Sequence, residues 1–71
     1  MQIQEIEHIA KVALRELGAG EPPLRIEPDT VPDRWRIDVG GNDPLTLTVR
    51  AGSGTTAQFV REQIFNQFAA R

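Results

Sequence analysis

The 71-residue sequence contains no cysteine and only one histidine, His8. Without thiols the chain can form neither a disulfide framework nor a thiolate zinc site, and His8 alone cannot anchor a histidine-rich metal site. A domain of this size buries only about 60% of its extended surface, so apolar packing has to supply the stability. We therefore expect one small domain over residues 1–71, with no metal site and no cofactor.

A basic excess and a long apolar run are also missing. Eight Lys and Arg oppose ten Asp and Glu, and the net charge is −2, unlike proteins whose affinity comes mainly from phosphate contacts. No apolar run approaches the roughly 18 residues of a membrane span. The first seven residues are acidic and amphipathic, unlike a signal peptide. We expect a cytoplasmic protein with no membrane partner.

Two segments have the apolar spacing of helices. Residues 2–17 place most of their apolar side chains on one face. These residues are Ile3, Ile6, Ala10, Ala13, Leu14 and Leu17. The second helix is expected to run to about residue 69, with Val60, Ile64 and Phe68 at four-residue steps. Its start matches a capping box, in which the side chains of Thr55 and Gln58 satisfy free amides reciprocally.

Three segments between the helices alternate apolar and polar residues, as half-buried strands do: 24–27, 34–39 and 45–50. Residues 40–44 form a five-residue hairpin connection. The alternation directs the apolar set toward the helices: Leu24, Ile26, Trp35, Ile37, Val39, Leu45, Leu47 and Val49. The polar set faces the other way: Arg25, Glu27, Arg34, Arg36, Asp38, Thr46, Thr48 and Arg50. The sequence predicts a two-layer α+β domain in the order α-β-β-β-α, with both helices on one face of a three-stranded antiparallel sheet.

Catalytic residues are scarce, and we expect that the protein is not an enzyme. Nucleophilic catalysis needs a nucleophile and a base within hydrogen-bond reach. The chain offers one serine, Ser53, in a glycine-rich turn, and one histidine, His8, on the polar side of the first helix. Each has an adequate local explanation as a turn residue or a solvated surface residue. The aspartates lie mostly in turns, where they serve the backbone.

The polar face of the sheet is the first candidate binding surface. It carries four of the eight basic residues: Arg25, Arg34, Arg36 and Arg50. Arginines there could receive phosphates or an acidic protein. The plainer interpretation is a solvated face with ion pairs to Glu27 or Asp38. None of the four aromatic residues is expected on this face, which disfavours stacking with single-stranded nucleic acid.

Two further features are weaker candidates. Gly52, Ser53, Gly54, Thr55 and Thr56 lie between a strand and a helix, where free amides can seat an anion. The loop lacks the lysine of a phosphate-binding loop. The capping box favours a cap with a tight turn as the explanation of this loop. Phe59 and Val12 each lie on a polar helix face. They are either scattered surface hydrophobes or, if they meet in space, the start of a partner or dimer patch.

The order of elements is similar to that of double-stranded-RNA-binding domains. Gly52–Ala57 stands where that family begins its second helix. The family carries a lysine cluster there to grip phosphates, whereas this chain has Thr56, Gln58 and Phe59 and no basic residue before Arg61. The resemblance therefore implies a topology only, and no binding residue is carried over.

These observations favour a small protein-interaction or regulatory module, whose partner is another protein or a second copy in a homodimer. Contact would be made through the arginine-bearing face, an exposed strand edge, or the Phe59 side of the second helix. The alternative is a nucleic-acid-binding domain that uses the four arginines or the Gly52–Thr56 turn. A small enzyme is the third possibility.

Overall fold

Two helices and three strands follow one another in the order α-β-β-β-α. The structure is a computed structural model that describes residues 1–42 and 44–70. The elements are α1 (Ile3–Glu16), β1 (Leu24–Pro28), β2 (Arg34–Val39), β3 (Leu45–Arg50) and α2 (Ala57–Ala70). The expected α+β architecture is confirmed. Asp43, in the middle of the expected 40–44 hairpin connection, lies outside the described residues.

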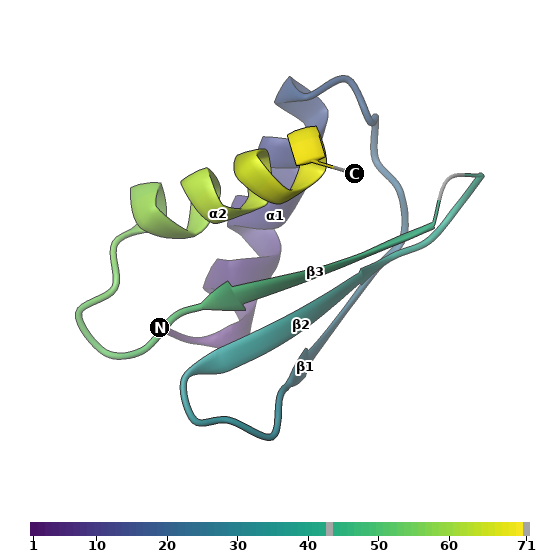
Figure 1. The fold of residues 1–71 in the computed structure, drawn as a ribbon. Helices are drawn as coiled ribbons and strands as arrows, with labels where there is room; N and C mark the ends of the chain where they lie inside the picture. Colours follow the sequence, from purple (N-terminus) through teal and green to yellow (C-terminus); the bar gives the residue numbers. More distant parts are fainter. Residues whose placement is uncertain (43, 71) are drawn as a thin grey trace.

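The three strands form one antiparallel sheet in the order β1-β2-β3. Ile37 in the central strand faces Ile26 of β1 and Leu47 of β3. Both helices cover the same face of this sheet, and α1 contacts β1 while α2 contacts β3 (Figure 1). The helices also contact each other. The result is two layers, with the other face of the sheet uncovered.

The core lies between the sheet and the two helices. It consists of side chains from every element except β1, together with one residue after β3: Ile6, Ala10, Ala13, Leu14, Ile37, Val39, Leu47, Val49, Ala51, Val60 and Ile64. Leu24 and Ile26 of β1 are half-buried against it. The period-two alternation therefore orients the strands as the sequence indicated, with the arginines on the uncovered face. No charged or polar residue is buried in the part of the chain that the structure describes.

Two residues of α1 differ from the sequence-based expectation. Ile3 was expected in the core face but is 38% exposed, because it is the first residue of α1 and packing begins one turn later at Ile6. Val12 was expected on a polar face but is half-buried. It lines a groove with Phe65, since α2 lies alongside this part of α1.

The predicted capping box is wrong by one residue. Because α2 begins at Ala57, the residue before it, Thr56, is the N-cap, and its hydroxyl accepts a hydrogen bond from the N–H of Phe59 at 3.1 Å. The Thr55 hydroxyl instead accepts from the N–H of Gly52 at 2.9 Å. The Gln58 amide donates to Glu62 and does not cap the helix.

Leu47→Ala is expected to lower the free energy of unfolding by about 2–5 kcal/mol, because it empties a fully buried position at the centre of the sheet. Thermal or denaturant unfolding followed by circular dichroism measures this loss. Val31→Ala, at a loop position that is 45% exposed, is the matched control and should change stability by less than about 0.5 kcal/mol. Equal losses in the two variants would contradict this account of the core.

Candidate functional site

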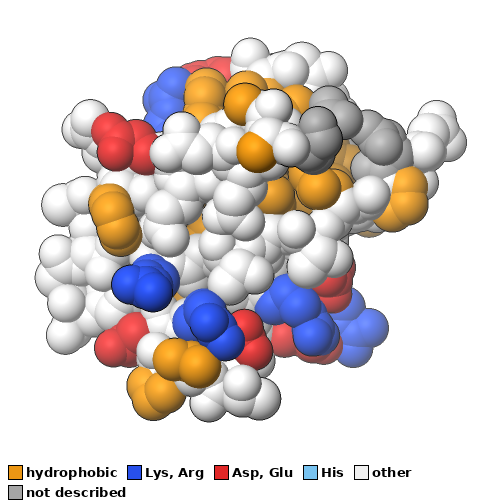
Figure 2. All heavy atoms as spheres, viewed as in Figure 1, with side chains coloured by type: hydrophobic (Ala, Val, Ile, Leu, Met, Phe, Trp, Pro, Cys, Tyr) orange, Lys and Arg blue, Asp and Glu red, His pale blue; other side chains and the backbone are white. Residues whose placement is uncertain are grey.

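The uncovered face of the sheet carries several ion pairs that share residues with one another. Glu27 lies at its centre, with the Arg25 guanidinium at 2.8 Å along the same strand and that of Arg36 at 2.6 Å across to β2. Arg36 also lies 3.6 Å from Asp38. Basic and acidic side chains are accordingly interleaved over the sheet in Figure 2. The arginines of this face thus contact carboxylates of the same chain.

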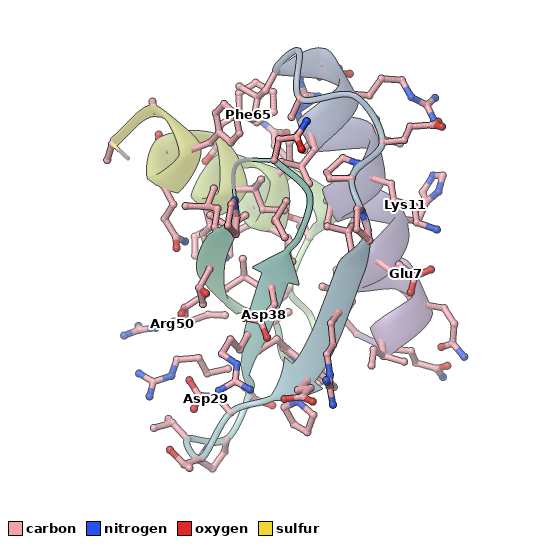
Figure 3. The ribbon with its side chains drawn as sticks, turned by 90° about the vertical axis from the view of Figure 1, so that its right-hand side faces the viewer. Glu7, Lys11, Asp29, Asp38, Arg50 and Phe65 are labelled. Carbon is pink, nitrogen blue, oxygen red and sulfur yellow. The ribbon has the colours of Figure 1, made fainter. Side chains whose placement is uncertain are left out.

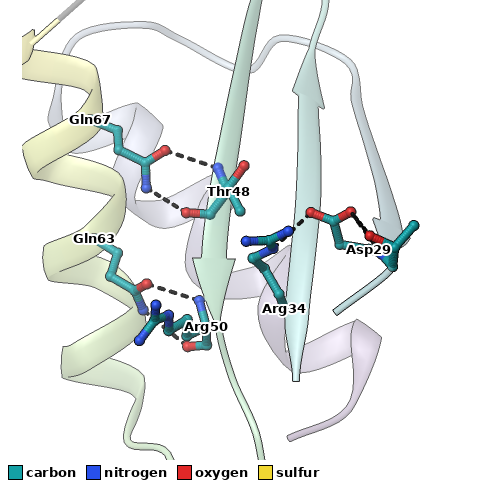
Figure 4. Close-up of polar contacts among 7 residues, drawn as sticks. Asp29, Arg34, Thr48, Arg50, Gln63 and Gln67 are labelled. Carbon is teal, nitrogen blue, oxygen red and sulfur yellow. Dashed lines mark hydrogen bonds and ion pairs between the residues drawn. The ribbon is translucent and has the colours of Figure 1, made fainter. Parts of the chain in front are cut away.

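Asp29 extends these pairs to the loop after β1. Its carboxylate accepts from the N–H of Thr30 at 2.7 Å and from the Arg34 guanidinium at 2.9 Å (Figure 4). The hydrogen bond from the Thr30 amide is the largest cause that holds the pKa of Asp29 below its ordinary value of 3.8. Desolvation opposes it, and the positive charge and hydrogen bond of Arg34 lower the pKa further.

Arg50 is the one arginine of this face with no carboxylate within 4.0 Å among residues 1–42 and 44–70. It projects from the sheet on the side opposite α1 (Figure 3). Four arginines and three carboxylates share the face, which leaves a single positive charge. This balance favours the solvated, ion-paired interpretation of the surface over a phosphate-binding one.

A shallow hollow of about 410 Å³ joins two of the sequence-based candidates. Arg34, Arg50, Gly52, Ser53 and Thr55 are among its lining residues. Asp33 also lines it, and its carboxylate lies against the Cα of Gly52. The Gly52 N–H already donates a hydrogen bond to the Thr55 hydroxyl. A carboxylate and an occupied amide make this hollow a poor seat for an anion.

A groove of about 880 Å³ runs between the two helices. Ile9, Val12, Ala57 and Phe65 form its apolar part, and His8 and Arg61 are among its polar residues. Phe65 lies between α2 and α1 in Figure 3. The Arg61 guanidinium lies 4.7 Å from the centre of the Phe65 ring and pairs with Glu16 across the helices. Arg61 therefore covers part of the apolar floor.

The sequence-based patch of Phe59 and Val12 does not form one hollow. Phe59 is 48% exposed and is not among the residues that line the groove, whereas Val12 is. His8 and Ser53 also line different hollows, and the structure does not bring them together as a catalytic pair. Among the described residues, no three His, Asp or Glu side chains form a group that could hold a metal ion. No helix in that part of the chain is long and apolar enough to cross a membrane.

The β3 edge of the sheet is closed by two glutamines of α2. Gln67 accepts from the N–H of Thr48 at 2.9 Å and donates to its carbonyl at 2.5 Å. Gln63 does the same for Arg50, at 2.8 and 3.0 Å (Figure 4). Each side-chain amide thus takes the place of a peptide group in a fourth strand. The i, i+4 spacing of these glutamines is the only signal of this role in the sequence, and no role was expected from it for either residue.

The β1 edge is open, and its hydrogen-bonding pattern follows from its two ends. Pro23 accepts from the N–H of Gly40 at 2.9 Å, and the N–H of Asp29 donates to Arg34 at 2.8 Å. Because hydrogen-bonded pairs alternate in an antiparallel ladder, the intervening residues that face β2 are Arg25 and Glu27. The N–H and C=O groups of Leu24 and Ile26 therefore point away from the sheet. The structure records no hydrogen bond to these outward groups from residues 1–42 and 44–70.

The two edges of the sheet thus differ in kind. One is capped by side chains of the same chain. The other offers two donors, the N–H groups of Leu24 and Ile26, and three acceptors, the C=O groups of Leu24, Ile26 and Pro28. From the sequence, a strand edge was one of three expected contact surfaces, and neither edge was preferred. Comparison with known protein families, with curated proteins and with solved structures finds no match for this chain.

Gln67→Ala is expected to speed hydrogen exchange at the Thr48 amide and to lower the free energy of unfolding by about 1 kcal/mol, because the edge loses two hydrogen bonds. NMR-detected exchange and chemical denaturation measure the two effects. Gln58→Ala, which removes only an exposed contact to Glu62, is the matched control. A Thr48 amide that exchanges at the same rate in both variants would mean that Gln67 does not close this edge.

The Asp29 carboxyl is expected to titrate below 3.8, because the Thr30 amide and Arg34 stabilise its charged form. A group with a lowered pKa stabilises the fold above its ordinary pKa, and this contribution is lost as the pH falls through the lowered value. The carbon-13 shift of the carboxyl, followed against pH, measures the midpoint. Arg34→Gln should raise it only partway, since the Thr30 amide remains, and Arg50→Gln should leave it unchanged. A wild-type midpoint at or above 3.8 would count against the assignment.

Proposed function

We propose that this chain is a non-catalytic protein-interaction module that binds an extended segment of a partner protein as a fourth strand along β1. The observation that carries the proposal is the difference between the two edges. Gln63 and Gln67 occupy the outward groups of Arg50 and Thr48 in β3, while the described residues make no hydrogen bond to those of Leu24 and Ile26. An unpaired strand edge is a template for an added strand.

The side chains beside this edge support the same mode of binding. Leu24 and Ile26 are half-buried on the helix side of the sheet, and Arg25 and Glu27 lie on the polar side. A strand added here would place alternate side chains against an apolar layer and against a charged one. Main-chain hydrogen bonds would supply affinity, and these two rows would supply specificity.

The other surfaces support a function less well. The arginines of the sheet face are largely paired with carboxylates, which weakens the phosphate attraction that a nucleic-acid-binding domain needs. The groove between the helices is partly covered by Arg61, and its floor has no feature that selects an occupant.

The test uses a display library of random 12-residue peptides, from which binders of the full chain are selected. We expect the selected peptides to slow hydrogen exchange at the Leu24 and Ile26 amides, because these become donors to the added strand. The amides of Thr48 and Arg50, already bonded to glutamines, should not change. Two-dimensional NMR of the bound and free protein measures this at each residue.

A synthetic chain with an N-methylated Ile26 provides the deciding variant, because it removes one outward donor and keeps the side chain. It should weaken binding of the selected peptides by about tenfold or more. N-methylation of Thr46 is the matched control. The N–H of Thr46 also points away from the sheet, as that of Thr48 does, but it lies on the β3 edge instead of the β1 edge. Peptides that protect the helix groove or the polar face and leave β1 unchanged would refute the proposal.

A further inference from the structure

We infer that the strand added at β1 is the β1 strand of a second copy of this chain, so that the protein forms a symmetric dimer with one continuous six-stranded sheet. This inference rests on the proposed function, because it names the partner of the same open edge. Three features of the chain lead to it: the outward hydrogen-bonding groups, the order of charges along β1, and the closed β3 edge.

The hydrogen-bonding groups of β1 are self-complementary about Ile26. A two-fold axis through the edge at this residue pairs β1 antiparallel with its own copy. The Ile26 N–H and C=O then bond the C=O and N–H of the partner's Ile26. The Leu24 N–H donates to the carbonyl of the partner's Pro28, and symmetry doubles this bond. Four main-chain hydrogen bonds result.

The charges of β1 favour this register. On the polar face, Arg25 lies opposite the partner's Glu27 and Glu27 lies opposite the partner's Arg25. The Arg25 side chain is 77% exposed and already lies 2.8 Å from Glu27 of its own chain. If the two-fold axis lies one residue away, at residue 25 or at residue 27, Arg25 lies opposite the partner's Arg25 or Glu27 lies opposite the partner's Glu27. Opposite charges across a strand pair stabilise it and like charges destabilise it, so one register is selected.

Pro28 is compatible with this pairing because it is the last residue of β1. Pro28 has no N–H, so the carbonyl of the partner's Leu24 receives no bond from it. The loss falls at the periphery of the interface, two residues from the axis. The central pair of hydrogen bonds at Ile26 is unaffected.

The closed β3 edge explains why such an assembly would stop at two copies. In the joined sheet the strand order is β3-β2-β1 followed by β1-β2-β3 of the partner. Both outer strands are then β3, and Gln63 and Gln67 occupy their outward groups at Thr48 and Arg50. Because side chains already occupy two of the three outward-facing residues of β3, this edge is a poor template for a further strand, and the contact closes as a dimer instead of extending into a filament.

The association is expected to be weak, because each copy contributes only five strand residues. It is tested with the full chain by sedimentation and by NMR over concentrations up to about 1 mM. The mass should rise toward that of two copies, and the Ile26 amide should exchange several-fold more slowly at high concentration. A chain that stays monomeric, or a dimer in which the Ile26 amide is not protected, would overturn the inference.

Charge reversal tests the register. Arg25→Glu and Glu27→Arg each place like charges opposite one another, so each variant alone should associate at least about tenfold more weakly than the wild type. An equal mixture of the two variants should recover association, because each then meets its opposite. The matched controls are Arg50→Glu and Glu5→Arg. These exposed residues lie away from β1, carry the same charge changes and have no ion pair with the other described residues.

Glu27→Arg also loses a pair with Arg36, so folding of each variant is checked by circular dichroism. If Glu27→Arg is unfolded, Arg25→Glu alone decides: dimerisation as strong as wild type overturns the inference. Selection of peptides separates the two proposals. If the chain is monomeric but selected peptides still protect Leu24 and Ile26, the partner is a different protein and only the self-pairing is wrong. If neither occurs, the proposed function fails as well.

Discussion

A β-strand presents its main-chain hydrogen-bonding groups to its two neighbours at alternate residues, and a three-stranded sheet has two edges at which half of these groups have no strand to meet. In this protein side chains of α2 form hydrogen bonds with such groups at the β3 edge. Val60 and Ile64 of α2 enter the core, and Gln63 and Gln67, on the adjoining side of the helix, reach the main chain of β3. The helix α2 therefore packs against the sheet and also caps its β3 edge.

This double role helps explain the placement of both helices. A helix that bonds the β3 edge has to lie over β3, which leaves the space over β1 to α1. The two helices meet between these positions, and the groove lined by Val12 and Phe65 follows from their meeting. The groove is thus a consequence of how the edge is closed. Its apolar residues stabilise the contact of the helices, and Arg61 covers them in part.

Local patterns predicted the elements, the sheet order and the face to which each strand residue points. Alternation is a property of neighbouring residues, so Ile37 and Leu47 were placed in the core correctly from sequence. The role of Gln63 and Gln67 was missed, because it depends on the position of a helix axis relative to a strand 13 to 19 residues away. Val12 was misplaced for the same reason. The N-cap error at Thr55 was smaller, since Thr55 and Thr56 are adjacent residues with the same hydroxyl.

The ion-paired face bears on the open edge as well. Since Glu27 pairs with Arg36 across to β2 and with Arg25 along β1, β1 offers an incoming strand a fixed order of charge next to its free amides. Opposite charges across a strand pair stabilise it, so a strand that places an acidic side chain beside Arg25 and a basic one beside Glu27 is favoured. Natural edge strands often avoid indiscriminate pairing through short length, charge and proline. Here β1 has only five residues, carries both signs of charge and ends at Pro28, so it has three of the features that limit indiscriminate pairing.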